Sequence, residues 1–203
     1  MNNRITSLKE KFRVALTSTA KVISEDLTLK NDKLENSNTL EIDDIKSPND
    51  FIRMRADTDS KALKKKFSND LIHKKNLPSS STSRLLYNIA EKIRYESLGG
   101  QMLKGIEKNF NKNYSLMINL KKKDQLKTKE DVPVAEAFEL YMLKNFHQIK
   151  LNPLTSKMLG FWEKTFEKSI EKHKKFLKEN LEDQNNYSSR FTKIFEEMDI
   201  FQT

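Results

Sequence analysis

Imidazole and thiol side chains carry much of the metal and proton chemistry of proteins, and this sequence offers few of them. Its three histidines, His73, His147 and His173, are far apart, and none belongs to an HExxH pattern. We therefore expect surface or interhelical histidines rather than zinc ligands. The chain has no cysteine, which excludes disulfide bonds, thiolate metal sites and cysteine nucleophiles and is consistent with a reducing compartment.

Motifs for phosphate binding and nucleophilic catalysis are also missing. Gly100 and Gly105 have the spacing of the Walker A glycines, but Ile106 and Glu107 follow where Lys and Ser or Thr are required. The chain has no Gly-x-Ser-x-Gly elbow, and its carboxylate pair at residues 196–197 is ordinary for a charged helix face. We therefore predict no catalytic, cofactor-binding or metal-binding residue in this chain.

The charge of the chain leaves nucleic-acid binding open as an alternative function. The 203 residues include 38 Lys and Arg against 29 Asp and Glu, for a formal net charge of +9. Basic clusters at residues 64–66, 74–75, 121–123 and 172–178 could contact phosphates. Only seven of the basic residues are Arg, the better reader of bases. The Lys surplus, together with 18 Asn, can instead reflect AT-rich coding on solvated faces.

Apolar residues recur with helical spacing through most of the chain, and Gly and Pro are rare, with four of each. Ser47, Pro48 and Asp50 predict a helix start, because Ser can cap, Pro suits the first turn and the acid completes a capping box. The spacing predicts helices over residues 7–23, 47–75, 81–110, 132–146, 155–182 and 187–201.

Two short apolar runs around an Asn-rich and Asp-rich connection predict a small β-ribbon at about residues 27–42. The expected fold class is therefore mainly α, a helical bundle with this small N-terminal β-ribbon. We expect residues 1–183 to form one helical domain and residues 184–203 to be a C-terminal helical extension.

The sequence predicts no membrane segment. Its longest uncharged runs, residues 76–83 and 113–120, are far shorter than the roughly 20 apolar residues that a spanning helix needs. The polar N-terminus lacks the apolar core of a secretory signal. We therefore expect a soluble, cytoplasmic protein.

Three stretches resemble the N-terminal region of the CobT subunit of aerobic cobaltochelatase. Residues 53–78 combine an Arg-rich start, Ala-Asp, Ala-Leu and a His before a Pro. Residues 94–110 are similar to the family's Arg-x-Glu-Ala-Leu-Gly helix with its later Gly and Asn, and residues 132–162 to its Pro-x-x-x-Ala and Leu-Trp helices. The resemblance covers about residues 10–180. The residues at matching motif positions are Arg55, Ala56, Asp57, His73, Gly99, Gly105 and Asn109.

The resemblance implies a non-catalytic interaction module with a role in cobalamin biosynthesis. In the intact complex, an AAA+ subunit of the CobS type hydrolyses ATP, and a large subunit of the CobN type holds the corrin, hydrogenobyrinic acid diamide. The CobT-like subunit couples the two while cobalt is inserted. ATP, magnesium and cobalt are thus expected only in the complex, and none of them in this chain.

The chain also departs from the family pattern. Family members continue into an acidic linker and a C-terminal von Willebrand A domain with a metal-ion-dependent adhesion motif, and this sequence contains neither. Residues 57–61 come closest to that motif but lack both of its serines. Ser97 replaces the usual Ala, and Leu103 stands where Met is expected. The alternatives are a truncated relative, half of a split subunit, the N-terminal domain alone, or a degenerate structural relative.

Two residue pairs are candidates for contacts with a partner subunit. Arg94 and Glu96 are two residues apart, so on a helix they face different directions and each needs its own partner. That partner lies either in another helix of the bundle or in another subunit. Phe161 and Trp162 are the second pair, because aromatic residues dominate protein interfaces, with core packing of Trp162 as the alternative.

Overall fold

Helices supply the regular structure of the computed structural model, which describes residues 2–28, 45–122 and 126–198. The helices are α1 (Asn2–Ser24), α3 (Pro48–Phe67), α4 (Asp70–Lys75), α5 (Ser81–Met102), α6 (Lys104–Leu120), α7 (Val134–Phe146), α8 (Pro153–Gly160), α9 (Glu163–Ile170), α10 (Lys174–Glu179) and α11 (Gln184–Glu197), with short 3-10 turns η2 (Lys129–Asp131) and η3 (Glu171–His173). The mainly-α prediction is confirmed.

The predicted β-ribbon is not seen among the described residues, which contain no strand. Of its residues 27–42, only Leu27 and Thr28 fall within the described ranges, and they form a turn. A hydroxyl and a backbone N–H of Thr28 donate to the Asp26 carboxylate at 2.6 and 2.9 Å, which closes this turn locally. The remaining residues of that prediction lie outside the described part of the chain.

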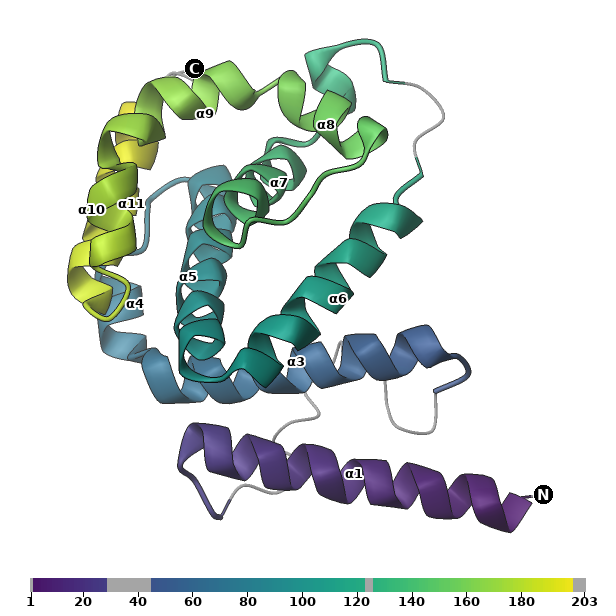
Figure 1. The fold of residues 1–203 in the computed structure, drawn as a ribbon. Coiled ribbons are helices and arrows are strands. Elements are labelled where there is room, and N and C mark those ends of the chain that lie inside the picture. The colour runs from purple at the N-terminus through teal and green to yellow at the C-terminus, as the bar shows by residue number, and fades with distance from the viewer. Residues whose placement is uncertain (1, 29–44, 123–125, 199–203) are drawn as a thin grey trace.

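Helix α5 is the centre of the arrangement (Figure 1) and packs against α3, α6, α7 and α11. Helix α3 crosses one end of α5, and α1 lies along the outer side of α3. Helices α4, α10 and α11 are gathered on the opposite side of the molecule from the N-terminus. No helix in the described ranges is long and apolar enough to cross a membrane.

Aromatic side chains fill the core where α7, α9 and α11 meet. The ring of Phe138 lies 5.5 Å from the rings of Phe166 and Phe195, in edge-to-face contacts. Such pairs add stability beyond the burial of their area. Tyr187 and Phe191 of α11 are buried in the same core, so this last helix is packed against the rest of the chain.

The predicted helix start at Ser47 is confirmed. The backbone N–H of Ser47 donates to the Asp50 carboxylate at 2.7 Å, and the Asp50 N–H donates to the Ser47 hydroxyl, which completes a capping box. Hydrogen bonds from the Ser47 hydroxyl and from backbone N–H groups lower the pKa of Asp50.

Three of the predicted helices are wrong in length, because each is broken in the structure. The predicted helix over residues 47–75 is interrupted at Ser68, and Asn69 caps α4 by accepting from the N–H groups of Leu71 and Ile72. The helix over residues 81–110 breaks at Leu103, which is extended and follows two glycines of low helix propensity. The helix over residues 155–182 is divided into α8, α9, η3 and α10.

Gly99 lets α5 approach α3 closely. A Cβ atom at this position would lie 2.3 and 2.6 Å from the two Leu63 methyl carbons, and Leu63 is fully buried. The exposed Gly105 of α6 has no atom within 4 Å of such a Cβ. The two glycines therefore have different roles in the structure, although both are predicted to match positions of the family motif.

Replacing these glycines by alanine should change stability in opposite directions. We expect Gly99→Ala to lower the free energy of unfolding by about 1–3 kcal/mol, because overpacking outweighs the gain in helix propensity. Gly105→Ala should raise it by roughly 0.5–1 kcal/mol. Urea denaturation followed by circular dichroism measures both. A Gly99→Ala protein as stable as Gly105→Ala would contradict the close packing of α5 on α3.

Candidate functional site

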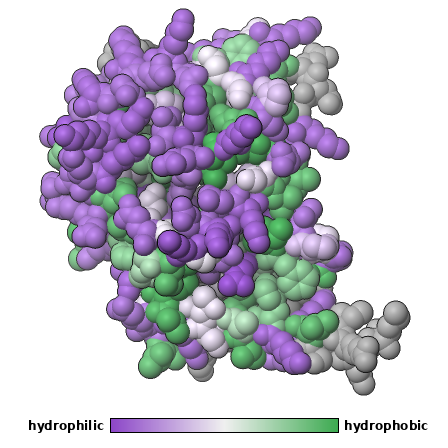
Figure 2. Space-filling view, viewed as in Figure 1, coloured by the Kyte–Doolittle hydropathy of each residue, from purple (hydrophilic) through white to green (hydrophobic). Residues whose placement is uncertain are grey.

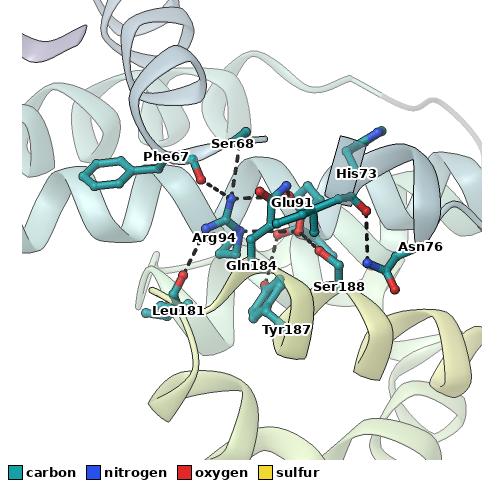
Figure 3. Close-up of polar contacts among 12 residues, drawn as sticks. Phe67, Ser68, His73, Asn76, Glu91, Arg94, Leu181, Gln184, Tyr187 and Ser188 are labelled. Carbon is teal, nitrogen blue, oxygen red and sulfur yellow. Dashed lines mark hydrogen bonds and ion pairs between the residues drawn. The ribbon is translucent and has the colours of Figure 1, made fainter. Parts of the chain in front are cut away.

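The guanidinium of Arg94 is fully buried where three segments of the chain meet (Figure 3). It donates to the carbonyl of Leu181 at 3.0 Å, to the carbonyl of Phe67 at 2.7 Å and to the hydroxyl of Ser68 at 3.2 Å. Phe67 is the last residue of α3, whose terminal carbonyls lack partners within the helix. Arg94 therefore closes the end of α3 and connects it to the loop before α11.

A buried carboxylate, Glu91, balances the charge of Arg94. The Arg94 Nε atom lies 3.4 Å from Glu91 Oε1. Two side chains of α11 also donate to Glu91, the amide of Gln184 at 3.0 Å and the hydroxyl of Ser188 at 2.7 Å (Figure 3). The ion pair and its donors therefore attach α11 to α5.

Glu96 belongs to a second buried cluster, between α3, α5 and α6. Its carboxylate accepts hydrogen bonds from the hydroxyls of Ser60, at 2.6 Å, and of Tyr114. Burial raises the pKa of Glu96, although Lys92 and the two hydroxyls oppose the shift. Burial also raises the pKa of Tyr114. Both groups are therefore biased towards their neutral forms.

His147, at the end of α7, faces this carboxyl group. Its Nε2 atom lies 3.8 Å from Glu96 Oε2, is inaccessible to solvent and has no hydrogen-bond partner. Burial, with a smaller effect of the Lys92 charge, lowers the pKa of His147 to about 4. The imidazole is therefore neutral at pH 7, and the contact with Glu96 is not an ion pair there.

A pocket of about 400 Å³ opens beside Glu96, between α3, α5 and α6. Arg53 and Lys92 contribute positive charge to its wall, and Met54 and Met117 contribute apolar surface. The pocket is where the first family-like stretch, residues 53–78, meets the second, residues 94–110. No three histidine, aspartate or glutamate side chains of the described residues come close enough together to hold a metal ion.

The residues of the first motif are divided between core and surface. Ala56 is buried, Arg55 is exposed, and Asp57 forms an ion pair with Lys61 at 3.1 Å. Asn109, from the second stretch, donates to the buried carboxylate of Asp59 at 2.7 Å.

Burial raises the pKa of Asp59, and Asn109 and Arg55 oppose that shift. Asn109 therefore binds this buried carboxylate directly, and Arg55 acts on it through its charge.

His73 lies apart from these residues, on α4. Its ring makes a hydrogen bond to the side-chain oxygen of Asn88 at 3.1 Å and packs beside Tyr87 at 5.0 Å. The Tyr87 hydroxyl in turn donates to the His73 carbonyl. These contacts attach the short helix α4 to α5.

Phe161 and Trp162 lie at the corner between α8 and α9, far from Arg94 and Glu96 in the sequence, and both are half-buried. The Trp162 indole N–H donates to the carbonyl of Val132 at 3.0 Å, and its ring stacks on Phe166. The ammonium group of Lys129 lies 4.0 Å from the Trp162 ring centre, in a cation–π contact. The two aromatic residues keep some accessible surface, whereas Arg94 and Glu96 have essentially none.

The partners of Arg94 and Glu96 were not identified from the sequence. One local signal was available: Glu91 and Arg94 have opposite charges at i and i+3 on an otherwise apolar helix face, which favours a pair. Ser60, Tyr114 and His147 are 36, 18 and 51 residues from Glu96, so no local pattern connects them.

The sequence model of the CobT family, described as cobalamin biosynthesis protein CobT, matches residues 6–203. The chain belongs to the CobT family. This membership implies a role in cobalamin biosynthesis. No curated protein and no solved structure shows significant similarity to the chain.

The Arg94–Glu91 pair of this CobT-family chain should show strong coupling. We expect Arg94→Met to lower the free energy of unfolding by about 3–5 kcal/mol, because it leaves the Glu91 carboxylate buried without a counter-charge. The Arg94→Met/Glu91→Gln protein should be more stable than Arg94→Met, since it buries no charge. Urea denaturation at pH 7 of both single variants, Arg94→Met and Glu91→Gln, and of the double variant measures the coupling, and losses that simply add would contradict the ion pair.

His147 should make stability depend on pH. Because its pKa is about 4 in the folded protein and 6.5 in the unfolded chain, the unfolded state binds more protons between these values. Its contribution to stability is complete above pH 6.5 and falls by about 3 kcal/mol as the pH is lowered to 4. His147→Phe should lose this dependence relative to the wild type, and equal slopes for the two proteins would contradict it.

Proposed function

We propose that this chain is a non-catalytic interaction module of a CobT-like cobaltochelatase subunit. In this role it couples an AAA+ ATPase of the CobS type to a large CobN-type subunit while cobalt is inserted into the corrin ring. The observation that carries the proposal is the family match over residues 6–203, nearly the whole chain. ATP, magnesium and the cobalt substrate are handled by the partners in this scheme.

The construction of the helical core supports a coupling role. A module that transmits a conformational change between two partners must be rigid, so that its helices keep their relative positions. The Arg94–Glu91 cluster connects α3, α5 and α11 through charge-assisted hydrogen bonds, which are roughly twice as strong as neutral ones. The contacts between α5 and α7 extend this connection to the α8–α9 corner through α7.

The α8–α9 corner is the candidate contact for one partner. Phe161 and Trp162 are half-buried aromatic side chains, the type most often found at interface hot spots. Trp162 is held in place by Val132 and Lys129, so little conformational freedom remains to be lost on binding.

Nucleic-acid binding is the second candidate function. The net charge of +9 and the Lys clusters favour it. It differs from the first proposal in a measurable way, because binding to nucleic acid weakens steeply with salt and is removed by nuclease.

Capture of partners from the cells that make this protein tests the proposal. We expect an AAA+ ATPase and a large chelatase subunit in the captured fraction, identified by mass spectrometry and resistant to nuclease. Phe161→Ala should reduce their capture about tenfold, the usual effect of losing an interface anchor. Phe176→Ala, a half-buried Phe on α10, is the matched control and should leave capture unchanged.

Absence of the ATPase from the wild-type fraction would contradict the proposed function. Ribosomal or nucleoid proteins that disappear with nuclease would favour the second candidate instead. Equal losses for Phe161→Ala and Phe176→Ala, with unchanged thermal unfolding of both, would exclude the α8–α9 corner as the contact.

A further inference from the structure

A small groove lies between α1, α3 and α6. Its lining residues are Phe12, Phe51, Ile52, Arg55, Asn109 and Lys112, and its volume is about 220 Å³. The rings of Phe12 and Phe51 meet edge to face at 4.8 Å and form its apolar wall. Small-molecule pockets usually have about 300–1,000 Å³, so this groove suits a single anchoring side chain better than a whole ligand.

Apolar side chains continue from this groove onto the surface. Phe51 is 37% exposed, and Leu8, one turn before Phe12 on the same side of α1, is 64% exposed. Figure 2 shows hydrophobic surface in the lower part of the molecule, over α1 and α3, whereas the upper left, over α9 to α11, is mostly hydrophilic. Apolar surface gathered in this way is typical of an interaction site.

Positive charge surrounds the same groove. From Leu8 to Ser24, helix α1 carries four basic residues and one acidic residue, and α6 carries three and one. Arg55 and Lys112, on the two sides of the groove, are exposed and form no ion pair with a residue in ranges 2–28, 45–122 and 126–198. Three lysines of α3 do form ion pairs: Lys61 with Asp57, Lys65 with Asp26 and Lys66 with Glu25.

We propose that this groove docks an acidic, amphipathic segment of a partner protein. An apolar side chain of the segment enters between Phe12 and Phe51, and its acidic residues face Arg55 and Lys112. The inference rests on the proposed function, because it names one surface of the interaction module and the chemistry of the partner that fits it. Helix-in-groove recognition of this kind uses apolar anchors at helical spacing.

The combination of residues favours a peptide over a nucleic acid. Phosphate backbones are bound by Lys and Arg together with polar side chains, and the apolar wall of Phe12 and Phe51 would contribute little to a duplex. An acidic amphipathic helix uses both features, because its apolar face is buried and its charges remain at the rim. Rim charges of this kind mainly set the association rate and its salt dependence.

Fluorescence anisotropy with a labelled peptide tests the docking surface. The probe is an 18-residue peptide with Leu and Phe at helical spacing and Glu elsewhere. A scrambled peptide of equal composition and an unlabelled DNA duplex are the comparisons. We expect the amphipathic peptide to bind and the scrambled peptide to bind at least about tenfold more weakly, because only the first presents one apolar face.

Matched charge reversals locate the binding site. Arg55→Glu/Lys112→Glu should weaken peptide binding at least about tenfold, equal to about 1.4 kcal/mol. Lys150→Glu/Lys193→Glu makes the same change in net charge on exposed residues elsewhere and should change binding less than about twofold. Phe51→Ser, which keeps all charges, should also weaken binding, and thermal unfolding of each variant checks its folding.

Three results would overturn the inference. These results are that the peptide does not bind, that both charge reversals weaken binding equally, or that the DNA duplex displaces the peptide and binds more tightly.

The test of the groove can be distinguished from the test of the proposed function. If the AAA+ partner is captured equally by wild type and Arg55→Glu/Lys112→Glu, the groove assignment fails and the module remains. If no partner is captured, the peptide titration still tests the groove.

Discussion

The buried guanidinium of Arg94 is the interaction on which the arrangement of the helices depends. It donates to the carbonyl of Phe67 at the end of α3, where helix carbonyls lack partners within the helix, and to the carbonyl of Leu181 in the loop before α11. Its charge requires Glu91, and Glu91 in turn orients Gln184 and Ser188 of α11. One side chain of α5 thus decides where α3 ends and where α11 docks.

Glu96 has a different role from Arg94, although the two residues are nearly adjacent in sequence. Its carboxyl group contacts two hydroxyls and a neutral imidazole, and burial raises its pKa, although the charge of Lys92 opposes that shift. Such a cluster joins α3, α5, α6 and α7 without a buried ion pair. The domain therefore uses two solutions to the cost of polar groups in a core, one on each side of α5.

The polar side chains of Arg94, Glu91 and Glu96 are buried and bonded within the bundle, so a partner can only contact residues at its surface. The residues predicted to match the family motif divide accordingly: Ala56 and Gly99 shape the packing, while Arg55 lies at the surface beside Asn109. The proposed contacts, the α8–α9 corner and the groove between α1, α3 and α6, lie on different elements. A coupling module requires two such separate surfaces on one firmly connected core.

The helical class, the Ser47 capping box and the family were determined by the sequence alone, because helical periodicity and caps are local and motifs are linear. The breaks at Ser68 and Leu103 were not, since apolar periodicity continues across both. At Ser68, distant partners, Arg94 and Gln184, also bind the chain around the break. The partners of Arg94 and Glu96 and the burial of His147 were decided only by the tertiary structure. Those contacts join residues tens of positions apart, and their strength comes from the removal of water, which only the assembled fold provides.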